Sequence, residues 1–243
     1  MSFAGIYDSG IGGLTTLFAL KKAFGPWDFY YLADTLSNPL GTKTYPEIVK
    51  TVSDGIDILK RHSRIQVVAC NTASTVVKPK GAYLLRPDLD ALPSETTLIL
   101  STPATERALK LKEKGYGVAE TKNLATAVEI LCETAFNSRD ITVINNLEGG
   151  LKSIVDEGMK GRKIERIYLG CSHYLYFKSI LKRLYPNVEI VDGNDRLIDE
   201  IRLANFTSNG QGEITFDFTL GNQSRKYEWL LAQMKEHPEI LDI

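Results

Sequence analysis

Short apolar segments alternate with longer amphipathic ones along most of the chain, and this order constrains the fold more than any other feature. Near the N-terminus an apolar strand at residues 3–7 runs into the loop DSGIGG, which leads into a helix at residues 14–24. Gly25-Pro26 then ends the helix. Strands and helices that alternate in this way favour a parallel α/β sheet.

Two α/β runs follow one another, and a polar, proline-containing stretch at residues 78–95 separates them. Hydrophobic periodicity places the other elements within each run. We expect strands at residues 28–33, 65–69, 98–100, 141–144, 167–169, 188–191 and 214–218, and helices at residues 46–61, 105–113 and 124–136, with two further helices in the tail from Asp195 onwards.

The charge balance excludes several classes of partner. The 243 residues include 29 Lys and Arg against 30 Asp and Glu, so the formal net charge is −1. Such a chain lacks the positive field that dominates nucleic-acid affinity, and it has no polybasic segment for an anionic membrane. No apolar run approaches the roughly 20 residues that span a bilayer, and the N-terminus is typical of a strand rather than a signal peptide. We therefore expect no nucleic-acid or membrane partner.

The cysteines are few, and their spacing excludes two common uses. Cys70, Cys132 and Cys171 form no CxxC pair, so neither a disulfide framework nor a zinc ribbon fits. No set of His, Cys, Asp and Glu residues has the spacing of metal ligands, and we predict no metal site. Free thiols in this number predict a reducing, cytoplasmic setting.

Two cysteine-containing segments share one pattern. VVACNTAS at residues 67–74 and IYLGCSHY at residues 167–174 each run from an apolar strand through a small residue to a cysteine and then to polar residues. Ligands of open α/β sheets bind at the carboxyl ends of the strands. Each half of the chain thus brings one thiol to a ligand-binding edge. Cys132 lies inside the apolar segment AVEILCETAF and receives no role, because free cysteines mostly pack as small hydrophobes.

Two thiols on opposite sides of a cleft suit one reaction in particular. One can remove a proton from one face of a carbon while the other returns a proton to the opposite face. Asp8 and His173 lie close to these segments and are candidate proton partners for Cys70 and Cys171. His62 ends a helix and His237 lies in a polar tail, so we assign neither a role.

The glycine loop at residues 8–13 admits three interpretations. It can bring backbone close to a ligand, it can belong to a dinucleotide site, or it can be a tight turn with no ligand. The dinucleotide interpretation is weakened because Thr15 stands where the third glycine belongs and Asp8 would face a pyrophosphate, although Asp34 could imitate the ribose-binding acid.

Six segments together resemble the cofactor-independent aspartate/glutamate racemase superfamily, most closely the glutamate racemases. They are DSGIGG (8–13), DT (34–35), NPLGTKT (38–44), ACNTAS (69–74), STPAT (101–105) and LGCSHY (169–174), and they occur in the family's order. The resemblance runs from the first strand to about Asp192 and more loosely through the tail.

The resemblance implies an α/β fold with two pseudo-symmetric, flavodoxin- or Rossmann-like domains and a substrate cleft between them. The first domain would comprise residues 1–93 with 200–243, and the second residues 94–199. The implied activity is racemisation of a small acidic amino acid, glutamate preferred, without cofactor, as a supply of D-glutamate for the bacterial cell wall; a homodimer is compatible with it. The implied site residues are Cys70 and Cys171 as acid/base pair, Asp8 and His173 as their assistants, and Ser9, Leu40, Gly41, Asn71, Thr72, Thr105 and Ser172 as substrate-binding residues.

The chain also departs from the family pattern. Leu40 stands where the family usually has Tyr, and Ser172 stands where Thr is usual. A family strand is not evident between Val77 and Thr97, and a Cys-Pro segment is missing before Leu147; the nearby acid Glu148 receives no role. These departures keep two alternatives open: a catalytically silent amino-acid-binding protein on the same scaffold, and a related racemase acting on aspartate or another substrate.

Overall fold

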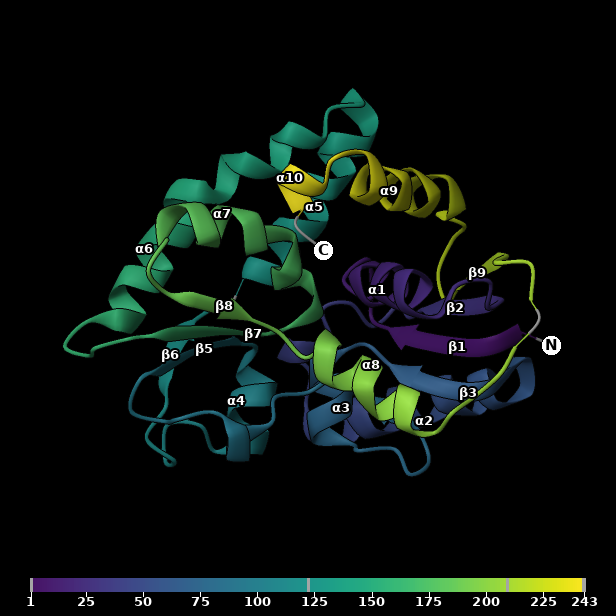
Figure 1. The fold of residues 1–243 in the computed structure, drawn as a ribbon, viewed down its shortest axis with the longest axis horizontal. Helices are drawn as coiled ribbons and strands as arrows, with labels where there is room; N and C mark the ends of the chain where they lie inside the picture. The colour runs from purple at the N-terminus through teal and green to yellow at the C-terminus, as the bar shows by residue number, and fades with distance from the viewer. Residues whose placement is uncertain (1, 122, 209, 242–243) are drawn as a thin grey trace.

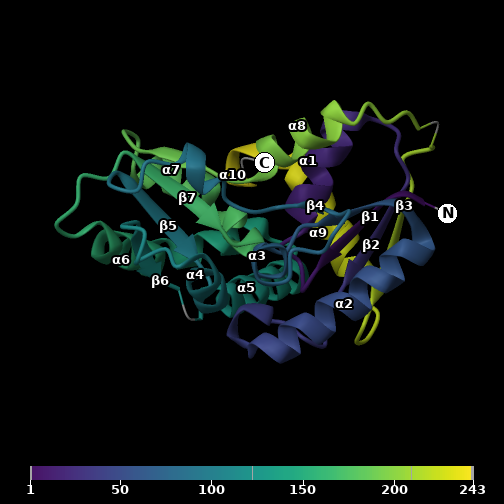
Figure 2. The ribbon, with the colours of Figure 1, turned by 90° about the horizontal axis from the view of Figure 1, so that it is seen from below.

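Two parallel β-sheets lie side by side, each flanked by helices, and form the two halves of the molecule (Figure 1, Figure 2). The computed structural model describes residues 2–121, 123–208 and 210–241. Each strand pair in both sheets is parallel. The predicted α/β class with two parallel sheets is confirmed.

The first sheet has the strand order β4-β3-β1-β2-β9, so the last strand of the chain returns to the sheet built by the first residues. Its central strands are buried along nearly their whole length, as expected for a parallel sheet covered on both faces. The strands are β1 (Ser2–Asp8), β2 (Phe29–Ala33), β3 (Ser63–Val68), β4 (Tyr83–Leu84) and β9 (Ile214–Phe218).

The second sheet has the order β6-β5-β7-β8. Its strands are β5 (Thr97–Ser101), β6 (Gly117–Glu120), β7 (Arg166–Gly170) and β8 (Glu189–Val191). One cluster of buried apolar side chains extends from the first sheet to the second, and includes Phe29 and Ile6 of the first and Leu98 and Leu169 of the second. The two halves therefore pack through a continuous hydrophobic core.

Helices cover both sheets, and several join the two halves. The helix α1 contacts α9 and α8, and α9 also contacts α5 of the second half. The helices are α1 (Leu14–Phe24), α2 (Tyr45–His62), α3 (Asn71–Val76), α4 (Pro103–Leu109), α5 (Leu124–Ser138), α6 (Glu148–Met159), α7 (Lys178–Leu184), α8 (Asn194–Leu203), α9 (Ser224–Glu236) and α10 (Pro238–Leu241), with short 3₁₀ turns η1 (Leu40–Thr42), η2 (Leu89–Ala91), η3 (Ile141–Leu147) and η4 (Ser172–Phe177).

Two of the expected elements differ in the structure. The expected strand at residues 141–144 is wrong, because Ile141–Leu147 forms a 3₁₀ turn whose start is capped by Asp140 accepting a hydrogen bond from the backbone N–H of Thr142. The helix expected at residues 105–113 begins earlier and ends at Leu109, where Lys110 adopts a left-handed conformation with φ 53°. The expected domain limits, residues 1–93 with 200–243 and residues 94–199, stay a prediction.

Two helical glycines test how closely the helices pack. A Cβ atom on Gly55 of α2 would lie 2.4 Å from the ring of Tyr7, whereas one on Gly150 of α6 would meet nothing within 4 Å. We expect Gly150→Ala to raise the free energy of unfolding by about 0.5–1 kcal/mol, because alanine favours helices. We expect Gly55→Ala to lower it by about 1–3 kcal/mol through overpacking. Urea denaturation measures both, and stabilisation by Gly55→Ala would contradict the packing of α2 on β1.

Candidate active site

The carboxyl ends of β3 and β7 carry the two thiols. Cys70 follows β3 and begins α3, and Cys171 follows β7 and begins η4. The side chains are 5% and 6% exposed, so both are enclosed in this structure. The charge of Cys171 also acts on Cys70, which places the two sulfurs in one electrostatic environment. The structure thus brings together two thiols that lie on different sheets.

The glycine loop after β1 makes a close contact between the two halves. The Ser172 hydroxyl donates a hydrogen bond to Asp8 Oδ2 over 2.8 Å, and both residues are buried. A Cβ atom on Gly12 would lie 2.4 Å from Ser172 Oγ and 2.7 Å from the backbone nitrogen of His173. Only glycine allows this approach. The loop is therefore part of the site and not merely a turn.

The surroundings of Cys70 keep it in the neutral thiol form. Ser9 Oγ lies 3.8 Å from Cys70 Sγ. Burial, followed by the nearby charge of Asp8, raises the pKa of Cys70 to about 12. Burial also raises the pKa of Asp8, although His173 and the hydrogen bonds from Gly10 and Ser172 counteract it.

The surroundings of Cys171 favour a protonated imidazole. His173 Nδ1 lies 3.9 Å from Cys171 Sγ, and His173 Nε2 lies 2.9 Å from Glu129 Oε1. Burial lowers the pKa of His173, but the hydrogen bonds to Cys171 and Glu129 outweigh burial, and the pKa lies well above its ordinary value. A protonated His173 can donate to both neighbours at once.

Glu129 of α5 is the site residue that sequence reasoning missed. Its Oε1 accepts hydrogen bonds from the backbone N–H of Ile11 at 3.1 Å and from Asn38 Nδ2 at 2.6 Å. Burial raises the pKa of Glu129, but the hydrogen bond to His173 outweighs it and the pKa is lowered. The carboxylate thus joins the second half of the molecule to two loops of the first.

The residues predicted to bind substrate form a polar wall beside Cys70. Thr72 Oγ1 lies 2.9 Å from Thr102 Oγ1 and 3.3 Å from Thr105 Oγ1. The backbone of Gly41 packs against Thr102, and Leu40 is buried beside it. Both amide atoms of Asn71 are buried without a hydrogen-bond partner. A buried amide without a partner in the protein points to a ligand that would satisfy it.

Comparison with known proteins decides the family. No protein-family model matches the chain. Glutamate racemase of Campylobacter concisus (strain 13826) is 33% identical over 226 residues, covering 82% of this chain and 82% of that protein. The chain belongs to the glutamate racemase family. It is accordingly an amino-acid racemase, and the resemblance drawn from the sequence is confirmed.

Further relatives of this racemase extend the similarity over the whole chain. Glutamate racemase of Halothermothrix orenii is 27% identical over 256 residues, covering 96% of this chain and 98% of that protein. The Escherichia coli glutamate racemase, solved with L-glutamate and the activator UDP-MurNAc-ala, shares its fold with a TM-score of 0.73 at 20% identity, covering 98% of this chain and 96% of that one. The Thermus thermophilus enzyme gives a TM-score of 0.71 at 21% identity, covering 94% and 93%.

The described part of the racemase contains neither a candidate metal site nor a helix that could span a membrane. No group of three or more His, Cys, Asp and Glu side chains in that part is arranged to hold a metal ion. None of its helices combines the length and the apolar character that crossing a membrane requires. Glu148, the acid that received no role, lies near the surface and pairs with Arg183.

Glu129→Gln tests the arrangement around His173. The amide keeps the shape of the side chain but removes the charge that favours a protonated imidazole. We expect the pKa of His173 to fall, because the hydrogen bond and charge of Glu129 are among the causes that raise it. The histidine signals in NMR spectra recorded across pH measure it, with His62 and His237 as internal references that should not move. An unchanged His173 titration would contradict the role given to Glu129.

Proposed function

We propose that this racemase interconverts L- and D-glutamate through Cys70 and Cys171 acting as an acid/base pair. The observation that carries the proposal is the enclosure of both thiols at facing strand ends, each beside its own ionisable partner. The substrate class follows from the glutamate racemases to which the chain is similar over at least four-fifths of its length.

The reaction needs one sulfur as thiolate and the other as thiol. The thiolate takes the α-proton and becomes a thiol, while the opposite thiol gives its proton to the other face of the planar carbanion and becomes a thiolate. No proton is gained or lost overall, and the two thiols exchange protonation states with each turnover. They therefore titrate as a coupled pair.

The neighbours of the thiols have distinct tasks in this mechanism. Protonated His173 stabilises a thiolate on Cys171, and Asp8 assists proton transfer at Cys70. The carbanion develops charge on the adjoining carboxylate, which the Asn71 amide and the hydroxyls of Thr72 and Ser9 are placed to bind. Positioned acid/base groups of this kind contribute roughly 10²–10⁴-fold each.

Substrate entry requires the two halves to separate. The Asp8–Ser172 hydrogen bond and the Glu129 contacts would break on opening and form again on closure. Closure excludes water, which would otherwise exchange protons with the carbanion. In a cell the product would serve cell-wall synthesis, which uses D-glutamate.

Replacement of single cysteines tests the two-thiol mechanism. We expect Cys70→Ala and Cys171→Ala each to lower kcat for racemisation by at least about 10³-fold, because either change removes one proton carrier. Circular dichroism of glutamate and α-proton exchange in deuterated water measure it. Cys132→Ala is the matched control, since Cys132 is buried in α5 and should leave kcat within a few-fold.

Two outcomes would contradict this mechanism. Turnover that survives in either single variant would exclude the thiol concerned as a proton carrier. Calorimetric binding of D- and L-glutamate by the native protein without any racemisation would instead favour the silent binding scaffold. The same titrations with aspartate determine which side-chain length the cleft prefers.

A further inference from the structure

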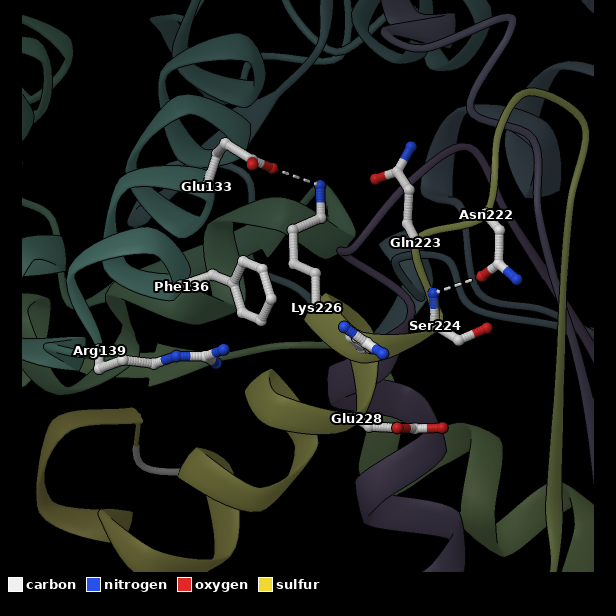
Figure 3. Close-up of a pocket in the computed structure, with 9 residues that line it drawn as sticks. Glu133, Phe136, Arg139, Asn222, Gln223, Ser224, Lys226 and Glu228 are labelled. Carbon is white, nitrogen blue, oxygen red and sulfur yellow. Dashed lines mark hydrogen bonds and ion pairs between the residues drawn. The ribbon is translucent and has the colours of Figure 1, made fainter.

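A buried lysine of the C-terminal helix α9 contacts α5, the helix that carries Glu129. Lys226, in the first turn of α9, is 9% exposed, and its Nζ lies 2.9 Å from Glu133 Oε2. Figure 3 shows this pair across the gap between α5 and α9, beside a cavity of about 910 Å³. Glu133 is half exposed, but burial of the Lys226 ammonium costs desolvation energy, and a function of this cation would explain why it is kept.

Glu133 lies one helical turn from Glu129 on α5, and the two side chains share a face. Both line a hollow of about 360 Å³ together with Lys226 and Asn38. Two negative charges at this spacing on a helix repel each other. The ammonium of Lys226 enters the same hollow and offsets that repulsion.

Several ionisable groups surround Glu129 and His173 and can influence their protonation. His173 faces Cys171, Asp8 and Glu129. Glu129 faces His173 and Lys226, and its charge also acts on a set of groups that burial keeps neutral, namely Tyr31, Tyr176, Tyr227 and Cys132. Among these groups only His173 and Lys226 carry positive charge. Lys226 thus supplies a second positive charge, besides the imidazole, that favours the Glu129 carboxylate.

We propose that Lys226 is a positioning residue of the racemase, which neutralises Glu133 so that Glu129 stays ionised and holds His173 beside Cys171. This inference rests on the proposed function and assigns a role in the reaction to the C-terminal helix. Lys226 touches neither the thiols nor the substrate in this arrangement, and it acts only through the two acids of α5.

The test compares charge changes of opposite sign. Lys226→Met leaves Glu133 unpaired beside Glu129, so the acid limb of the kcat/KM profile should move to higher pH by roughly 0.5–1 unit. Glu133→Gln removes the repelling charge and should move the limb to lower pH. Lys226→Arg keeps the charge and should restore the native profile. Lys235→Met removes a cation from the same helix away from α5 and is the matched control.

A purely structural salt bridge predicts a different result. Lys226→Met and Glu133→Gln would then impair activity in the same direction and at all pH values, with parallel losses in Tm. That outcome, or an acid limb that stays in place in Lys226→Met, would overturn the proposal. If Lys226→Met does not fold, the direction of the shift in Glu133→Gln decides.

A second readout separates this inference from the proposed function. The NMR signals of His173 sense protonation of Glu129 at low pH without any turnover. Their acid inflection should move upward in Lys226→Met and downward in Glu133→Gln. If the native protein shows no racemisation but these shifts occur, the proposed function fails and the role of Lys226 toward Glu129 stands; unmoved inflections contradict that role.

Discussion

A buried hydrogen bond from the Ser172 hydroxyl to the Asp8 carboxylate joins the carboxyl edges of the two sheets one residue from Cys171, and the placement of the site loops depends on the close approach that it requires. It forms only because Gly12 lets the loop after β1 lie directly against Ser172 and the backbone of His173. Two buried phenols fix the loop, since Tyr31 and Tyr176 donate to the carbonyls of Gly10 and Ile11. Tyr31 belongs to the first sheet and Tyr176 to η4 of the second half, so the loop is hydrogen-bonded from both halves.

Site residues that lie within short sequence motifs could be predicted from the sequence. Site residues that reach the site only through the packing of helices could not. DSGIGG, ACNTAS and LGCSHY each place their side chains at the end of a strand, so the strand order alone brings Asp8 close to Cys70. Glu129 reaches His173 across 44 positions of sequence, and Lys226 reaches Glu133 across 93. Both contacts depend on how α5 packs against η4 and α9, which no periodicity in the sequence expresses.

The errors in the predicted elements have local causes. All four residues at 141–144 have β-branched side chains and therefore resemble a strand, but the Asp140 cap turns the chain before a strand can form. The missed strand β6, with the sequence GVAE, offers too few apolar residues to stand out, and its place beside β5 comes from sheet pairing. Neither residues 141–144 nor β6 lies at a strand end that bears a thiol. The prediction of the site residues therefore did not depend on these two elements.

The two sides of the site differ chemically although the reaction that they serve is symmetric. Enantiomers have equal free energies in water, so under the proposed two-thiol mechanism the enzyme must reach both protonation forms of the pair without a large energy difference between them. The structure gives Cys70 a buried, anionic neighbourhood that favours the thiol, and it gives Cys171 an imidazole neighbour whose pKa is raised. This asymmetry would make one protonation form of the thiol pair much more stable than the other unless the bound substrate offsets it. The ammonium group of a bound amino acid near Asp8 would lower the free-energy cost of a thiolate on Cys70, so the substrate itself would bring the two protonation forms closer in energy.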